Sequence, residues 1–210
     1  EDIWQILFWR AFFFSITLSL FLYFTYKNEA LYIIKKSGIP GVVGGIAMAI
    51  GFTAYVFAMS ETTVANVLFI ISTQTIWLAL FGYFFLKEKI SFKTFLSIIL
   101  AMIGISVMIG GSLSTGSMQG NLVALFIPIN FAFLILLIRK YSNLDLIPAL
   151  FYGGLIVTIV AFFMTETILI SGHNLLVGFF LGTFQHAFGF ICIVIAARST
   201  PAVVVGLLML

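Results

Sequence analysis

Two residues with a charged or ionisable side chain stand among apolar neighbours in this sequence. Arg10 stands in the stretch QILFWRAFFF, among five aromatic residues, and His186 stands in GTFQHAFGF. A guanidinium stays charged at any physiological pH and is costly to place among apolar groups, so such a residue is a candidate for function. We hypothesise that Arg10 attracts an anionic group or latches a gate, and that His186 contacts substrate or carries a proton.

Residue sets typical of catalysis or metal binding are missing from the sequence. Both aspartates, Asp2 and Asp145, fall in predicted loops, no carboxylate lies near His186 in the chain, and no Gly-x-Ser-x-Gly motif occurs. Intramembrane hydrolysis needs paired aspartates, a nucleophile with its base, or clustered histidines and carboxylates. The single cysteine, Cys192, provides neither a disulfide nor a thiolate cluster. We therefore expect no catalytic residue, no metal and no cofactor.

The composition indicates that Arg10 and His186 lie on membrane-spanning helices. The 210 residues are 62% hydrophobic and 8% charged, whereas soluble domains are about a quarter charged. A bilayer is crossed by a helix of about 20 apolar residues, and uncharged runs of such length occur at 37–60, 64–86, 94–111, 146–165 and 175–197. The composition predicts an all-α integral membrane protein, a polytopic helix bundle.

The hydrophobic pattern predicts the individual helices and their ends. Eight segments are expected, at about 3–26, 39–59, 63–86, 93–111, 121–138, 146–168, 175–197 and 201–210. Thr200 and Pro201 favour an N-cap followed by proline in the first helical position, at the start of the last segment. Because the chain opens on Glu1 and stops within the apolar run VVVGLLML, we interpret both ends as truncations.

Basic residues mark one side of the membrane. Nine of the ten lysines and arginines fall in alternate loops, namely Lys27, Lys35, Lys36, Lys87, Lys89, Lys93, Arg139, Lys140 and Arg198. Such an excess in short loops is typical of the cytoplasmic face. We predict a multi-pass protein of the cell membrane, in a bacterial inner membrane, with these loops in the cytoplasm. Arg10 is the exception, on the outer half of its helix.

An internal repeat relates the two halves of the chain. A shift of 138 residues aligns Gly44 with Gly182, Gly51 with Gly189 and Thr62 with Thr200. The match pairs the second segment with the seventh, five helices apart, so the halves have opposite orientations in the membrane. We predict two inverted-topology five-helix repeats, with ten helices when complete and about eight here. Residues 1–111 form the first repeat without its first helix, 112–121 a linker, and 122–210 a truncated second repeat.

Several stretches resemble the EamA-type transporters of the drug/metabolite transporter superfamily. They are ILFWRAFFF, VFAMSETTVANVLFIIS, GYFFLKEKIS, GNLVALFIPINFAFLILLIRKY and AARSTPAVVV, which together extend over essentially the whole chain. The resemblance implies alternating-access movement of a small metabolite through a central cavity between the halves. It also includes an arginine near the position of Arg10. Family members often carry proline where Thr75 stands, which leaves open whether that helix is kinked.

Polar and aromatic residues inside the predicted spans are candidates for lining a cavity. The set is Arg10, Tyr55, Asn66, Thr73, Gln74, Trp77, Asn130, Tyr152, Gln185 and His186. On a continuous helix, Gln185, His186, Gly189 and Cys192 share one broad face. Several candidates also have a structural alternative: hydrogen bonding between helices for Asn66, Thr73, Gln74 and Asn130, packing for Trp77 and Tyr55, and a satisfied core histidine for His186. For Arg10 there are two structural alternatives, an interfacial anchor or an ion pair with Glu1, Asp2 or Glu61.

These features favour a transporter for a small polar or amphipathic metabolite. An aromatic cavity with few fixed charges favours neutral or zwitterionic solutes, and no carboxylate lies deep enough in a span to relay protons. The partners expected are a small-molecule substrate, membrane lipid and a second copy in a homodimer, with no nucleic acid. An intramembrane enzyme or a non-transporting membrane scaffold is the alternative.

Overall fold

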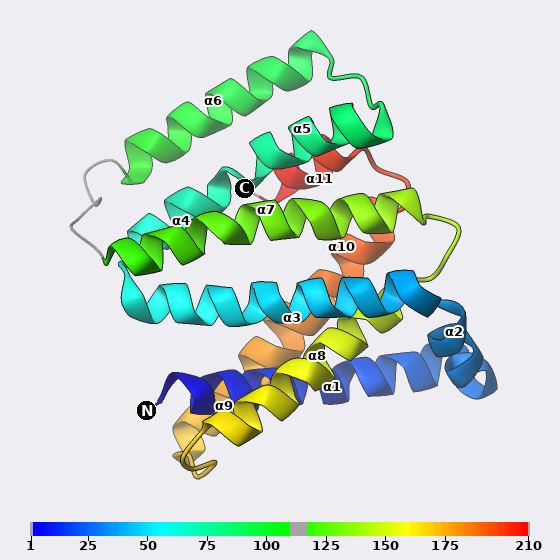
Figure 1. The fold of residues 1–210 in the computed structure, drawn as a ribbon, viewed down its shortest axis with the longest axis vertical. Helices are drawn as coiled ribbons and strands as arrows, with labels where there is room; N and C mark the ends of the chain where they lie inside the picture. The colour runs from blue at the N-terminus through cyan, green and yellow to red at the C-terminus, as the bar shows by residue number, and fades with distance from the viewer. Residues whose placement is uncertain (1, 110–116, 210) are drawn as a thin grey trace. The chain divides into compact units, whose positions relative to one another are not determined.

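The protein is a bundle of apolar helices. The computed structural model describes residues 2–109 and 117–209, and those residues form helices, turns and loops without any strand (Figure 1). Six helical stretches in them are long and apolar enough to cross a membrane, at Ile3–Lys36, Gly38–Glu61, Val64–Leu86, Met118–Lys140, Ile147–Met164 and Gly172–Ala197. The prediction of an all-α polytopic membrane protein is confirmed.

All eight predicted segments are helical, and two of them are divided. The elements are α1 (Ile3–Tyr26), η1 (Lys27–Glu29), α2 (Ala30–Lys36), α3 (Gly38–Glu61), α4 (Val64–Ser72), α5 (Gln74–Leu86), α6 (Phe92–Ile109), α7 (Met118–Lys140), α8 (Ile147–Met164), α9 (Gly172–Phe180), η2 (Leu181–Phe188), α10 (Gly189–Ala197) and α11 (Ala202–Leu208). The third predicted segment consists of α4 and α5, and the seventh consists of α9, η2 and α10. Of the predicted linker, 112–116 lies outside the described residues and 118–121 belongs to α7.

One compact unit comprises residues 1–53 and 141–195. In this unit, α1 packs along α8 and against η2. Glycine permits the close approach: a Cβ on Gly154 of α8 would lie 2.5 Å from the Ser15 hydroxyl oxygen and 2.7 Å from the Phe14 ring. The core between these helices is therefore dense, with Phe14, Leu18 and Leu150 almost fully buried.

The second compact unit comprises residues 54–140 and 196–210. Its central helix is α7, which packs against α4 and α5, and α11 packs against α5. A Cβ on Gly206 of α11 would lie 2.7 Å from the Leu78 side chain, so this contact also depends on a small residue. Each unit takes helices from both predicted repeats. Because compact units and sequence repeats are different divisions of a chain, the repeat organisation stays a prediction.

Candidate functional site

Arg10 points into the interior of the first unit. Its residue surface is 8% exposed, its Nη2 lies 2.8 Å from Nε2 of His186, and its guanidinium carbon lies 5.8 Å from the ring centre of Phe52. The side chain therefore turns toward η2 and α3 instead of extending along the helix surface. Of the acidic partners considered from the sequence, Glu1 lies outside the described residues.

The hydrogen bonds of His186 determine its tautomer. An arginine side chain has only donors, so Nε2 of His186 must accept from Arg10. The other ring nitrogen, Nδ1, lies 2.8 Å from the carbonyl oxygen of Leu181 and donates to it. The ring in this arrangement is neutral, with its proton on Nδ1. His186 therefore orients the guanidinium without cancelling its positive charge.

A π-helical segment brings His186 to this position. η2 interrupts the helix between α9 and α10, and such wide turns are frequent at functional sites. Its Gly182 lies directly against α1, because a Cβ there would be 2.5 Å from the Arg10 carbonyl oxygen. The wide turn and the glycine together place the imidazole beside the arginine. Hydropathy alone does not reveal such a turn, since the span Gly172–Ala197 as a whole is apolar enough to cross a membrane.

A small cavity adjoins the arginine. It has a volume of about 110 Å³ and is lined by Ile6, Trp9, Arg10, Ile170, Asn174, Val177, Gly178 and Leu181. Such a volume holds on the order of three water molecules, or one small polar group. Asn174, which the sequence analysis did not select, adds a second polar side chain. It stands in the first turn of α9, where Ser171 caps the helix by accepting from its backbone N–H, so its sequence signal was an amide near a helix end.

The loop between α8 and α9 is tied to the first turns of α1. The indole nitrogen of Trp9 donates to the carbonyl oxygen of Ile168 at 2.9 Å, and the Gln5 amide donates to that of Leu169. Indole and amide donors in apolar surroundings need such partners. These bonds hold the loop at the end of the helix from which Arg10 projects.

Two other candidates of the first unit do not join this pair. The hydroxyl of Tyr152 donates to the carbonyl oxygen of Ile34 at 3.2 Å, which links α8 to α2. Its side chain also packs against α3, where a Cβ on Gly45 would lie 2.6 Å from the Tyr152 Cβ. Gln185 is exposed. Tyr152 therefore joins α8 to α2 and α3.

Asn66 of the second unit takes part in hydrogen bonds between helices. Its side-chain nitrogen lies 3.2 Å from the Thr62 hydroxyl and 3.3 Å from Oδ1 of Asn121, at the start of α7. Thr62 itself donates to the same Asn121 oxygen at 2.8 Å. This network connects the α3–α4 turn with α7, as the structural alternative for Asn66 describes.

A break in the third span lies where the family resemblance left a kink open. α4 ends at Ser72 and α5 begins at Gln74, without proline. The hydroxyls of Ser72 and Thr73 donate to the carbonyl oxygens of Phe69 and Ile70, both at 2.6 Å. Two successive bonds of this kind compete with the backbone ladder and bend helices. Thr73 is thus part of the break itself.

The remaining candidates of the second unit have varied surroundings. Gln74 is 5% exposed, while Trp77 is half-buried with its ring 6.3 Å from that of Phe81. Tyr55 packs at the edge of a core cluster formed by Ala58, Val67, Ala124 and Ile127. Asn130 is half-buried on α7. Lining of a substrate cavity by any of these four stays a prediction.

Glu88 is a residue that the candidate set lacked. Its Oε1 pairs with Nε of Arg139 at 2.9 Å, and its Oε2 accepts from the backbone N–H of Ala202 at 2.9 Å. Arg139 also donates to the carbonyl oxygen of Arg198 at 2.8 Å. Glu88 therefore connects the end of α5 with α7 and the start of α11.

The predicted N-cap of the last helix, Thr200, is wrong by one position. Pro201 is the N-cap of α11, and the Glu88 carboxylate accepts from the first helical N–H, that of Ala202.

The sequences of known proteins resemble this chain. The sequence model of the EamA-like transporter family matches residues 1–110. Among curated proteins, an uncharacterized transporter of Clostridium kluyveri is 28% identical over 182 residues, covering 79% of this chain and 58% of the relative. The chain thus spans less than two thirds of that relative's length. No solved structure matches the chain significantly.

Proposed function

Because the chain belongs to the EamA-like transporter family, we propose that it moves a small polar or amphipathic metabolite across the membrane. The movement occurs by alternating access between two inverted repeats, as transporters of this architecture do. The bacterial relative described as a transporter supports the same activity. Arg10 and His186 form part of the substrate route.

One observation supports placing Arg10 and His186 on the substrate route: a buried guanidinium is hydrogen-bonded to a neutral imidazole beside a small cavity. Arg10 donates to His186 and lines the cavity with Asn174. A positive charge that its neighbour orients but does not neutralise attracts an anion, and a guanidinium binds a carboxylate with two parallel hydrogen bonds. The substrate class that fits is a zwitterionic or carboxylate-bearing metabolite with an apolar part.

Counterflow in proteoliposomes tests this function with the full-length protein. Vesicles are loaded with one unlabelled solute, and uptake of its labelled form is compared with that of the decarboxylated analogue. We expect exchange of the zwitterion and little exchange of the analogue, because the analogue lacks the group that Arg10 binds. Exchange of decarboxylated analogues alone would exclude the role of Arg10. No exchange across a broad panel of carboxylate-bearing solutes would exclude the substrate class.

We further propose that the lysine-rich loops face the cytoplasm of a bacterial cell. The test uses a Cys192→Ser background and single cysteines at Lys35, Lys89 and Glu166. All three positions are exposed. The Lys35→Cys and Lys89→Cys variants should resist an impermeant thiol reagent in intact cells, and the Glu166→Cys variant should react within minutes. Permeabilised cells provide the control, because all three cysteines should then react. The reverse pattern in intact cells would contradict the orientation.

A further inference from the structure

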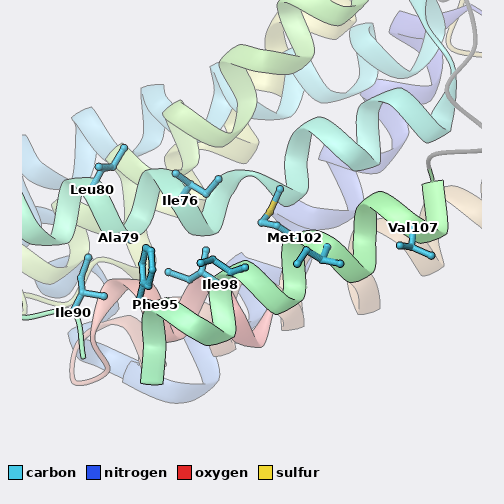
Figure 2. A pocket seen from close by; sticks show the side chains of 10 residues that line it. Ile76, Ala79, Leu80, Ile90, Phe95, Ile98, Met102 and Val107 are labelled. Carbon is cyan, nitrogen blue, oxygen red and sulfur yellow. The ribbon is translucent and has the colours of Figure 1, made fainter. Parts of the chain in front are cut away.

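An apolar groove runs between α5 and α6 in the second unit (Figure 2). It has a volume of about 710 Å³, and the described side chains that line it are apolar: Ile76, Ala79, Leu80, Ile90, Phe95, Ile98, Ile99, Met102, Ile103 and Val107. Within residues 2–109 and 117–209 the groove is open, since Phe95 is 53% and Val107 is 78% exposed. These lining residues have no polar side chain for a hydrophilic solute, so the groove suits a long apolar chain.

The length of the groove matches one leaflet of a bilayer. Twelve helical steps separate Phe95 from Val107, which corresponds to about 18 Å along α6. Half of the hydrocarbon core is about 15 Å thick. Ile90 lies in the loop before α6, so the groove starts at the end of the helix pair and continues into the span. An acyl chain that enters beside this loop would lie along α6.

Three lysines lie close in sequence to Ile90, at the loop end of the groove. Lys87, Lys89 and Lys93 are exposed and lie within three residues of Ile90. The acidic residue among them, Glu88, is engaged by Arg139 of α7 and by the N–H of Ala202 of α11. Its charge is therefore already compensated, and the loop has a surplus of positive charge. Basic clusters next to a span attract anionic lipid headgroups.

We propose that the groove and its lysines bind an anionic phospholipid, with one acyl chain along α6 and the phosphate at Lys87, Lys89 and Lys93. The lipid belongs to the leaflet on the lysine-rich side. This inference goes beyond the transport function and does not depend on the substrate. Apolar lining alone would accept any lipid; the lysines give the preference for negative charge.

Native mass spectrometry of the full-length protein tests the proposal. Phosphatidylglycerol and phosphatidylcholine with identical acyl chains are titrated in detergent, and the bound fractions are compared. We expect phosphatidylglycerol to bind preferentially and the K87Q/K89Q/K93Q variant to lose that preference, at roughly a fivefold weaker affinity per lysine. The matched control is K27Q/K35Q/K36Q, which removes the same charge near α2 on the same side. Equal losses in both variants would show nonspecific attraction and overturn the proposal.

A second variant tests the apolar part separately. Ile103→Trp fills the open groove at a residue that is 55% exposed, so folding is little affected. It should weaken binding of both lipids at least severalfold while all three lysines remain. Free glycerol phosphate should not compete, because it lacks the acyl chains. Unchanged phosphatidylglycerol binding by Ile103→Trp would overturn the proposal, and a simultaneous shift from dimer to monomer would assign the groove to a second copy of the chain.

Discussion

Replacement of Arg10 by glutamine is expected to remove most transport while the protein still inserts and folds. Truncating a buried, hydrogen-bonded charge that faces an anionic partner costs about 2–4 kcal/mol of binding. That range corresponds to a roughly 30- to 1,000-fold lower transport efficiency. Glutamine retains a donor for Nε2 of His186, 2.8 Å from Arg10, so the local packing has little reason to collapse. The measurement is initial uptake normalised to the amount of protein in the membrane.

Arg10→Lys distinguishes a substrate clamp from an interfacial anchor. Lysine keeps the positive charge and can reach toward the interface, but it lacks the planar fork that binds a carboxylate with two bonds. A clamp should therefore lose most transport with lysine as well, mainly through a higher KM. An anchor would tolerate lysine. Full transport by both Arg10→Gln and Arg10→Lys would reject the functional role of this residue.

The second large effect is expected for Gly182→Ala. The added Cβ would lie 2.5 Å from the Arg10 carbonyl oxygen, 3.0 Å from the Phe13 Cβ and 3.1 Å from the Phe14 nitrogen. Two of these atoms belong to the backbone of α1, which cannot move aside as a side-chain tip can. Overpacking of this kind costs about 1–3 kcal/mol, and contact with backbone places the expected loss near the upper end. Thermal unfolding in detergent measures it as a lower melting temperature.

A matched control lies in the same span. Gly189 has open space around its Cβ position, with nothing within 4 Å. Gly189→Ala should therefore leave stability unchanged or raise it by up to about 1 kcal/mol, because alanine favours a helix more than glycine does. Equal melting temperatures for the Gly182→Ala and Gly189→Ala variants would contradict the close approach of η2 to α1.

The helices could be predicted because the bilayer demands long apolar runs, and the ends mostly agree within a few residues. The breaks within the third and seventh predicted segments could not be predicted. The one at Thr73 arises from two hydroxyls that compete for carbonyls, and the one at η2 from a shifted hydrogen-bond pattern. Both spans, Val64–Leu86 and Gly172–Ala197, stay apolar enough overall to be predicted as single helices. Glu88 escaped the sequence analysis for another reason, since its partners lie 51 and 114 residues away.

The candidate site was predictable in its residue types but not in its grouping. Arg10 and His186 were both selected as unusual, and the structure brings them together across 176 residues. Which way Arg10 points could not be decided from α1, because that helix is apolar on all sides and has no polar face to orient it. Asn66 was selected for the same polarity as His186, yet its neighbours Thr62 and Asn121 engage it in a network of its own.

The π-helical segment has a consequence for how this span is compared with related ones. An α-helix turns by about 100° per residue, so one additional residue in a turn rotates everything after it by that angle. η2 therefore changes the direction in which the residues of α10 face relative to those of α9. In this segment His186 meets Arg10 while its neighbour Gln185 is exposed. A relative with one residue fewer here would present a different side chain to α1 at the same depth. The length of this segment therefore specifies the site as much as its composition does.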